Sequence, residues 1–394
     1  MKKRALIWIA GFIFLSFMLG FNLETSLARK NEQELYREIE RFVNVLNIVK
    51  NEYVTPVEDK KLIYGALKGM LSSLDPYSAF LEPEASKELQ METSGEFEGV
   101  GMEITLKDGI ITVVSPIQDS PAWNAGIRPG DKIIEIDGQS TKGMNTWEAA
   151  QKLRGKKGTS VTISILREHT TKIMKITLVR DVIKIKSVKS SILPENIGYI
   201  RITGFQERTA NDLEAVLKEF NNQMITALIL DLRNNPGGLL NAAIDVSDMF
   251  LPKGKIIVSI QGRKPEDKKV YVSQKPQIWD KPVVLLINNG SASASEILTG
   301  AIKDNLNSCR TVGLKTFGKG SVQNLIKLDE EGTSIKLTIA YYYTPSGLRI
   351  DGKGIEPDVK VEITEDNVEM GIPEKDIQLK KAIEEVSKML IAAK

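Results

Sequence analysis

Three serines spaced two residues apart, in "NNGSASASEILTGAIKDN" (288–305), follow an apolar run and precede a helical pattern. A serine hydroxyl is a weak nucleophile until a neighbouring base removes its proton. Histidine is the usual base, yet the chain has one histidine, His169, far upstream in a predicted hairpin turn of another region. We interpret His169 as a bystander, so a serine here would need a different base.

Ser293 is the serine whose spacing fits the start of a helix. Glu296 follows it at the spacing of a capping box, whereas the other two serines have alanine or leucine at that position. Most capping serines do nothing else. A helix N-terminus also carries unpaired N–H groups and partial positive charge, which stabilise an alkoxide or a tetrahedral oxyanion. Ser293 is therefore a candidate nucleophile and the amide of Ala294 a candidate oxyanion donor.

A candidate base lies downstream in "GLKTFGKGSVQ" (313–323), where Lys319 stands between two glycines. Such a lysine is usually solvated and charged. A desolvated lysine can instead lose its charge and act as a general base near neutral pH. Because the surrounding α/β region has no histidine, Lys319 is the plausible base there, and Gln323 could hydrogen-bond its neutral amine.

The same stretch is nearly a phosphate-binding loop, since 313–320 reads G-x-x-x-x-G-K-G. That loop needs Ser or Thr after the lysine to hold Mg²⁺, and it leads from a strand into a helix. Here Gly320 occupies the required position, and "SVQNLIKL" continues with a strand-like pattern. We therefore do not expect a nucleotide site.

A second glycine turn lies in "ALILDLRNNPGGLL", where Gly237 and Gly238 precede a helical pattern. Paired glycines let backbone amides approach a substrate oxygen closely. The stretch is equally compatible with a plain strand-to-helix turn that has no function.

The composition excludes several kinds of site. Of 394 residues, 42% are hydrophobic and 26% charged, which is ordinary for a folded soluble body. The net charge of +2 gives no reason to expect nucleic acid as a partner. The single cysteine, Cys309, excludes an intramolecular disulfide, and a metal site would need almost only carboxylate ligands. We expect neither a metal nor a cofactor.

The N-terminus has the pattern of an export signal. Three basic residues, 2–4, precede an uncharged apolar run over 5–21, and small residues within 26–28 form a weak cleavage site. The run is close to the lower limit for a membrane span, and the basic side predicts a cytoplasmic N-terminus. Residues 1–28 are thus either a cleaved signal or a retained anchor, and both place the rest outside the cytoplasm.

The remaining chain divides into three predicted regions. Residues 29–90 contain two amphipathic helical patterns, near 31–50 and 59–74. Residues 91–180 contain short apolar or alternating runs with glycine punctuation, which predicts a small β-domain. Residues 181–394 alternate strand and helix patterns, which predicts an α/β layer structure with buried strands.

Four stretches together resemble the C-terminal processing (tail-specific) serine peptidases. They are "DLRNNPGG", "NNGSASASEILTGAIKD", "TFGKGSVQ" and "YYYTPSGLRIDGKGIEPD", in the order of that family. The resemblance implies a ClpP/crotonase-like αβ peptidase core with an inserted PDZ domain and an N-terminal helical segment. It also implies a Ser–Lys dyad without a cofactor. On the matching positions the catalytic set is Ser293, Lys319 and Gln323, with oxyanion donors at Ala294 and the Gly237–Gly238 turn.

The middle region resembles a PDZ domain through "EGVGMEI" (98–104) and "DSPAWNAGIRPGDKIIEIDGQ". Backbone amides of such a glycine loop cradle a terminal carboxylate while the peptide adds as a strand to the sheet edge. The resemblance places this loop at Gly99, Val100, Gly101 and Met102. Arg154 is a candidate regulatory link between the PDZ domain and the active site. A purely structural β-domain is the alternative.

These observations predict an exported serine endopeptidase of the periplasm or cell envelope. Its PDZ domain would capture substrates with free, apolar C-termini. The N-terminal helices could form a homo-oligomer, and an activating partner could switch the enzyme on. The alternative is a catalytically silent PDZ scaffold that recruits extracytoplasmic partners. The intact set of Ser293, Lys319 and Gln323 argues against the scaffold.

Overall fold

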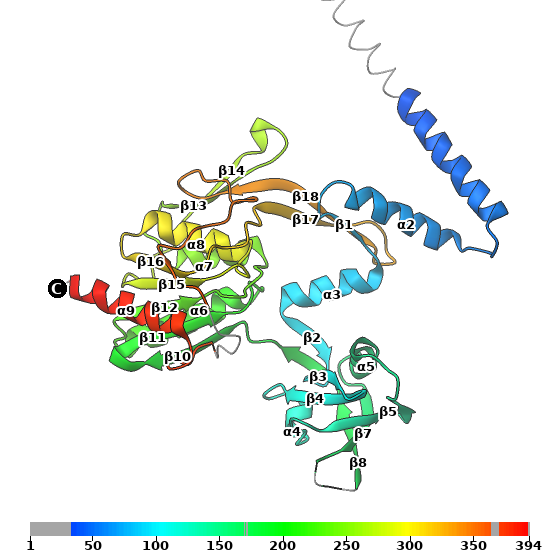
Figure 1. Cartoon of the computed structure of the whole chain (residues 1–394), viewed down its shortest axis with the longest axis horizontal. Coiled ribbons are helices and arrows are strands. Elements are labelled where there is room, and N and C mark those ends of the chain that lie inside the picture. The colour runs from blue at the N-terminus through cyan, green and yellow to red at the C-terminus, as the bar shows by residue number, and fades with distance from the viewer. Residues whose placement is uncertain (1–32, 169, 171, 364–369, 393–394) are drawn as a thin grey trace, which may run out of the picture. The chain divides into compact units, whose positions relative to one another are not determined.

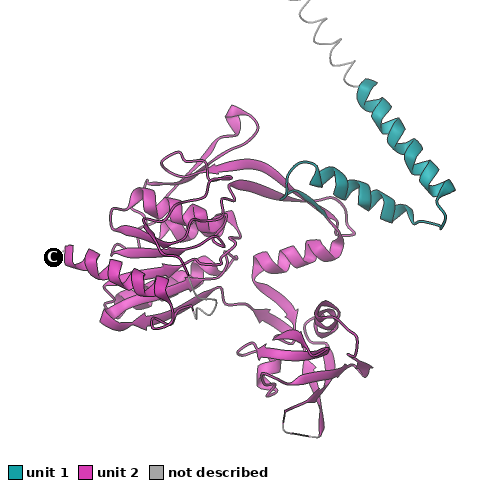
Figure 2. Ribbon diagram, in the orientation of Figure 1, with its two compact units in different colours: residues 1–80 teal, residues 81–394 magenta. Residues whose placement is uncertain are grey.

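The computed structural model describes residues 33–168, 170, 172–363 and 370–392, which form two compact units over 1–80 and 81–394 (Figure 2). The predicted signal or anchor, 1–28, lies outside the described residues, as does His169. Export therefore stays a prediction. In the described part of the chain, no helix is long and apolar enough to cross a membrane.

The first unit consists of two helices. Residues 33–52 are helical, and α2 spans Asp59–Ser72. The second helix ends at an Asx turn, because Asp75 Oδ1 accepts the N–H groups of Tyr77 at 2.7 Å and Ser78 at 2.8 Å. The first helix exposes a row of apolar side chains: Leu35, Ile39, Phe42 and Val43 are each more than 40% exposed. Self-association through this row stays a prediction.

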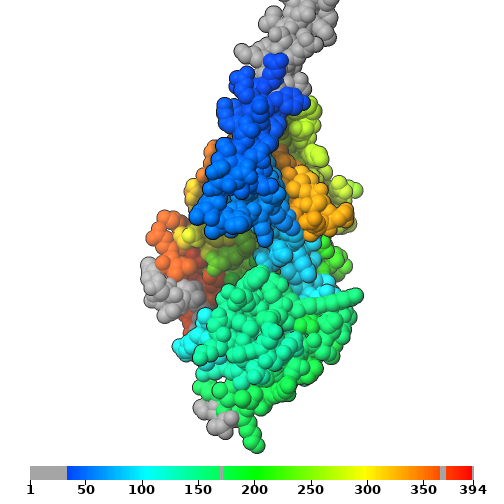
Figure 3. Space-filling view, turned by 90° about the vertical axis from the view of Figure 1, so that its right-hand side faces the viewer, coloured from blue at the N-terminus to red at the C-terminus, as the bar shows by residue number. Residues whose placement is uncertain are grey.

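The β-domain begins after α3 (Pro83–Ser94) and has its own apolar core. Its main sheet has the order β3-β4-β5-β7-β8, β6 pairs with β5, and β2 pairs with β9. In the space-filling view these residues form one rounded body (Figure 3). The elements are β2 (Glu96–Gly99), β3 (Met102–Lys107), β4 (Ile110–Pro116), α4 (Pro121–Asn124), β5 (Lys132–Ile136), β6 (Gln139–Ser140), α5 (Thr146–Leu153), β7 (Ser160–Leu166), β8 (Ile173–Val179) and β9 (Asp181–Lys184).

The core of residues 188–392 is a three-layer α/β structure (Figure 1). Its sheet has the order β10-β11-β12-β15-β16-β19, parallel except at β10. The elements of this sheet and its helices are β10 (Val188–Leu193), β11 (Ile197–Ile202), α6 (Thr209–Asn222), β12 (Ala227–Asp231), α7 (Leu240–Asp248), β15 (Val283–Ile287), α8 (Ala294–Asn305), β16 (Cys309–Gly313), β19 (Val359–Lys360) and α9 (Ile377–Ala392).

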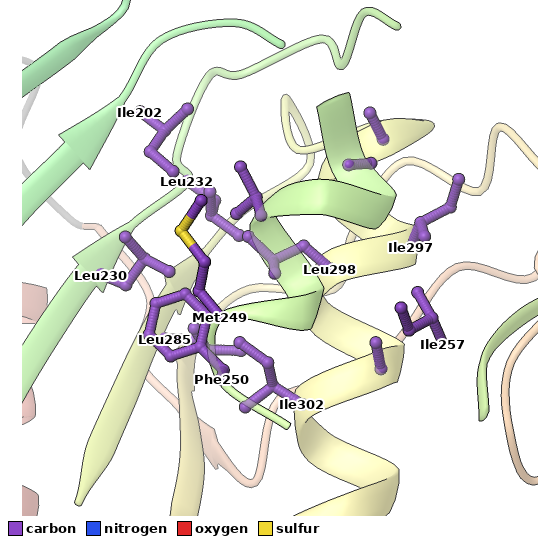
Figure 4. Close-up of a cluster of buried hydrophobic side chains, with 14 of the residues drawn as sticks. Ile202, Leu230, Leu232, Met249, Phe250, Ile257, Leu285, Ile297, Leu298 and Ile302 are labelled. Atoms are coloured by element: carbon purple, nitrogen blue, oxygen red, sulfur yellow. The ribbon is translucent and has the colours of Figure 1, made fainter. Parts of the chain in front are cut away.

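Alternate residues of the central strands point to opposite helical layers. Leu230 and Leu285 pack on the side of α6, α7 and α8, where Phe250 and Ile302 join the same cluster (Figure 4). The intervening residues, such as Ile229, pack with α9 on the other side. Strands buried on both faces read as continuous apolar runs, which is why "ALIL" and "VVLLI" are apolar throughout.

A second, antiparallel sheet carries the β17–β18 hairpin. Its order is β14-β13-β18, with β17 pairing to β18. Its strands are β13 (Ile256–Gln261), β14 (Lys269–Val272), β17 (Ser321–Lys327) and β18 (Ser334–Tyr343). The residues between β16 and β17, 314–320, contain Lys319 and are called the lysine loop below. A strand rather than a helix follows this loop, as the sequence predicted. The predicted α/β class is confirmed.

Candidate active site

Ser293 lies in a tight turn between β15 and α8. Asn288 shapes the turn, because its Oδ1 accepts the N–H of Gly290 at 3.0 Å. Ser293 is the residue before the helix, has φ 53° and ψ −112°, and is 7% exposed. A positive φ is uncommon for a residue with a Cβ and is a form of strain that gathers at functional sites. The backbone therefore holds this serine in a conformation that simple helix capping does not require.

The three serines have different partners. The Ser291 hydroxyl donates to the Leu232 carbonyl oxygen at 2.8 Å, and the Ser295 hydroxyl to the Asn235 carbonyl oxygen at 2.9 Å. The Ser293 hydroxyl interacts instead with the side chain of Tyr342. The hydroxyl protons of the outer two serines thus hold the turn together, whereas the middle hydroxyl is not bonded to a backbone carbonyl of the turn in the same way.

The Ser293 hydroxyl lies beside a buried tyrosine. Burial raises the pKa of Tyr342 to about 12, and the hydrogen-bonding influence of Ser293 opposes that rise. Tyr342 therefore stays neutral across the physiological range. Its N–H donates to the Gly320 carbonyl oxygen at 2.7 Å, which places β18 next to the lysine loop.

A buried carboxylate joins the serine turn to the lysine loop. Glu296 Oε2 accepts the N–H of Ser293 at 2.8 Å and that of Lys319 at 2.9 Å. Glu296 Oε1 accepts the Thr316 hydroxyl at 2.6 Å and the Gly318 N–H at 2.7 Å. Glu296 has no exposed surface. The predicted third position of the capping box thus has a second role, because it fixes the backbone of Lys319 against that of Ser293.

Burial changes the proton affinities of both charged groups. It raises the pKa of Glu296, although the four donors to its carboxylate act in the opposite direction. It lowers the pKa of Lys319, and the like charge of Lys336 lowers it further, while Glu296 opposes both effects. The net decrease makes the neutral amine of Lys319, which is the form that can accept a proton, more accessible than in a solvated lysine.

Gln323 follows an irregularity in the β17–β18 pairing between Val322 and Gln323. Its Nε2 donates to Ser321 Oγ at 2.8 Å and to Thr338 Oγ1 at 3.4 Å. The Nε2 of Gln323 is therefore bonded to hydroxyls of its own sheet, and the contact of Gln323 with the Lys319 amine stays a prediction.

The glycine turn lies directly against the serine. Gly237 has φ 102°, and a Cβ on it would lie 2.7 Å from the Ala292 carbonyl oxygen and 2.9 Å from the Ala294 nitrogen. A Cβ on Gly238 would come still closer to the backbone of Phe205. The Gly237 N–H already donates to Asn235 Oδ1 at 2.9 Å. The amides of Ala294 and Gly238 are consequently better placed to receive an oxyanion than the amide of Gly237.

Asn235 was not identified from the sequence, although it organises this turn. Its Nδ2 donates to the Ile202 carbonyl oxygen at 2.8 Å, and its carbonyl oxygen accepts the Ala292 N–H at 3.0 Å. It therefore bonds to β11, to the glycine turn and to the serine turn. The buried-strand pattern before "RNNPGG" indicated the location, but no local signal indicated these partners.

The predicted carboxylate loop, Gly99–Met102, joins β2 to β3. Its carbonyls are engaged, since Val100 O accepts the Ala122 N–H at 2.8 Å and Gly101 O accepts the Ser120 hydroxyl at 2.8 Å. Gly101 has φ 76° and lies against Ser120. In the described sheet β3 pairs only with β4, so its other edge is available for an added strand.

Arg154 ends α5 and lies in the wall of a cavity of about 890 Å³ between α3 and the β-domain. Its guanidinium lies 3.5 Å from Glu88 of α3 and 5.6 Å from the ring centre of Phe97. The structure thus places it between two parts of the second unit, and its regulatory role stays a prediction. Within the described ranges, no group of His, Cys, Asp and Glu residues is arranged to hold a metal ion.

The site combines a buried serine with a nearby lysine of lowered pKa, and a separate β-domain presents β3 as an edge strand. This combination is typical of a PDZ-containing serine peptidase. Sequence profiles agree: residues 196–361 match peptidase family S41, 112–167 match the PDZ domain, and 20–85 match "Activating protease CtpB N-terminal domain". A carboxy-terminal-processing protease of Bartonella bacilliformis is 44% identical over 367 residues, covering 92% of this chain and 83% of the relative. The chain belongs to peptidase family S41.

Two further comparisons agree. Carboxy-terminal processing protease CtpA of Bacillus subtilis is 42% identical over 80% of this chain and 67% of its own. A structure from Bacteroides fragilis, described as an S41 protease, covers 88% of this chain and 97% of its own, with 16% identity and a TM-score of 0.53. The latter shows a shared fold. The predicted family, fold class and serine-type peptidase activity are confirmed.

Replacing Gly237 by alanine should abolish most cleavage, because the added Cβ would push the glycine turn away from Ser293. We expect a loss of about 100-fold in kcat/KM, as for other misplacements of about 1 Å at an active site. Gly254→Ala is the matched control, since Gly254 also has positive φ (86°) but has open space around it. Both variants should lose about 1 kcal/mol of unfolding free energy through the strained φ, and Gly237→Ala should lose more because its Cβ also clashes. Equal activity of the two variants would contradict the close contact.

Proposed function

We propose that the chain is an exported endopeptidase that captures substrate C-termini in its PDZ domain and cuts them with a Ser293–Lys319 dyad. The observation that carries this proposal is the Glu296 carboxylate, whose Oε2 accepts the N–H groups of both residues. Beyond its part in the capping box of α8, this carboxylate thus holds the backbones of the proposed nucleophile and base at one separation.

In the proposed reaction Ser293 Oγ attacks the carbonyl carbon of the scissile peptide bond, and Lys319 Nζ takes the hydroxyl proton. The tetrahedral oxyanion is stabilised by the amide of Ala294, at the positive end of α8, and by the amide of Gly238 in the glycine turn. Lys319 then gives the proton to the leaving amine, and the C–N bond breaks. A water activated by the same amine hydrolyses the acyl-enzyme and restores Ser293.

Lys319 can serve both steps because its pKa is lowered by burial and by Lys336. A base with its pKa nearer the working pH accepts and returns a proton more easily than an ordinary lysine. The neutral Tyr342 hydroxyl beside Ser293 adds a polar but uncharged wall.

Export is the remaining part of the proposal, and the basic 2–4 segment followed by the apolar 5–21 run supports it. In cells that have not been lysed, but whose outer envelope has been opened, an added protease should digest the full-length chain. A chain that becomes accessible only after cell lysis would contradict export.

Ser293→Ala should reduce cleavage of an unstructured protein with an apolar C-terminus to background, because the nucleophile is lost. Ser291→Ala and Ser295→Ala should keep cleavage but lose about 1 kcal/mol of unfolding free energy, since each removes one of the two hydrogen bonds that a buried carbonyl accepts. Cleavage rates and denaturation curves of the three variants measure this. Cleavage that survives in Ser293→Ala would move the nucleophile to another serine, and inactivity of the parent protein too would favour the scaffold.

Lys336→Met should shift the pH profile of kcat/KM. Cleavage requires neutral Lys319, so activity rises with pH through the Lys319 pKa. Removing the like charge of Lys336 raises that pKa, moves the rising limb to higher pH and slows cleavage near neutrality. Lys327→Met, which removes an exposed charge from the same hairpin, should leave the profile in place. If the rise of kcat/KM occurs at the same pH in Lys336→Met as in the parent protein, Lys336 does not lower the pKa of Lys319.

Amidating the C-terminus of a substrate peptide should weaken its binding to Ser293→Ala protein by about tenfold or more, because the carboxylate no longer meets the amides of the 99–102 loop. Titration calorimetry with the free and amidated peptides measures this. Equal affinities would remove the carboxylate from the recognition mechanism.

A further inference from the structure

An arginine without exposed surface lies directly before the glycine turn. Arg233 Nε and Nη2 donate to Asp231 at 2.9 and 2.6 Å, and Nη1 and Nη2 donate to Asp376 at 2.8 and 2.7 Å. Nη1 also contacts Gln378 Oε1 at 3.1 Å. The Arg233 side chain, which makes all five of these contacts, is 0% exposed. One guanidinium therefore connects the end of β12 with the start of α9.

The partners of Arg233 are themselves held in place. Asp231 Oδ2 accepts the Tyr199 hydroxyl at 2.7 Å. Asp376 accepts the N–H groups of Gly371 and Leu379, both at 3.0 Å, so it also caps α9. Burial would lower the pKa of Arg233, but the hydrogen bonds from its two carboxylate partners raise it overall, so the guanidinium stays charged.

Docking of α9 does not require this network. Leu379, Ala382 and Val386 are fully buried against the sheet and already supply an apolar interface. A buried ion pair adds little net stability, because the desolvation of the charges offsets most of their attraction. In some proteins such a group fixes one particular arrangement of the chain, and that role is the hypothesis tested below for Arg233.

The arrangement fixed here is that of the glycine turn. Two residues after Arg233, the Asn235 side chain accepts the Gly237 N–H at 2.9 Å and its carbonyl oxygen accepts the Ala292 N–H at 3.0 Å. A rotation of the backbone at 233–235 would therefore move both the glycine turn and the serine turn.

We propose that the segment beginning at Asp376 is a positioning element of the active site. Through the Arg233 guanidinium, Asp376 sets the 234–238 turn at the distance from Ser293 that the oxyanion requires. The proposal rests on the proposed Ser293 mechanism and adds a contribution from a segment 143 residues away in sequence from Arg233. Asp376 is a positioning residue, because it acts through Arg233 and does not itself meet substrate.

Asp376→Asn tests the proposal, because it keeps the size of the side chain and removes its charge. At a temperature where circular dichroism shows the variant folded, we expect kcat to fall about tenfold or more and KM to stay within about twofold. A peptide boronate, which forms a tetrahedral adduct on the serine, should lose affinity by a similar factor, whereas a product peptide should bind unchanged. A merely structural role would lower the melting temperature without moving these ratios.

Glu384→Gln is the matched control, since it removes an exposed ion pair from the same helix and should change neither kcat nor boronate affinity. Unchanged kcat in folded Asp376→Asn would overturn the proposal, as would an equal loss in Glu384→Gln. If Asp376→Asn does not fold, Gln378→Met decides, with a smaller loss of kcat supporting the proposal and an unchanged kcat overturning it. Failure of the Ser293 mechanism is recognised separately, because the parent protein would then be inactive or indistinguishable from Ser293→Ala.

Discussion

The Glu296 carboxylate is the constraint on which the candidate site depends. Four donors converge on it from three points of the chain: the serine turn, Thr316 and the lysine loop at 318–319. Leaving any of these buried donors unpaired would cost about 1–3 kcal/mol. The arrangement that satisfies Glu296 is therefore one that holds the backbone of Lys319 near that of Ser293. A spacing that looks like ordinary helix capping consequently also builds the site.

Close backbone contacts determine the remaining geometry. Gly237 and Gly238 lie against Ala292 and Phe205 where a Cβ would clash, and Ser293 itself has positive φ. Asn235 and Asn288 are among the residues that hold the turns on either side in these strained conformations. The residues that react are few, and most of the polar atoms around them serve to fix backbone positions.

The sequence predicted what local patterns encode. The apolar runs of β12 and β15 and the S-x-x-E spacing before α8 located the strands and the serine, and the four stretches with family resemblance located the site. The contact of Thr316 with Glu296 and that of Arg233 with Asp376 join residues far apart in the chain, and no periodicity marks them. The amide of Gly237 also looked free in sequence, whereas a side chain two residues earlier already occupies it. The fold class and the location of the site were thus predictable from the sequence, but the hydrogen-bond partners of the site residues were not.

The apolar cores explain how recognition and chemistry can stay separate. The β-domain packs around its own cluster, which includes Ile133 and Ile163, while the peptidase sheet has one cluster on each face. None of these clusters shares a side chain with another. The β-domain can thus bind or release a peptide without repacking the residues around Glu296. Polar contacts do connect the two, since Arg208 before α6 lies 3.6 Å from Glu96 of β2, and Arg154 meets Glu88 of α3 on the same side of the β-domain.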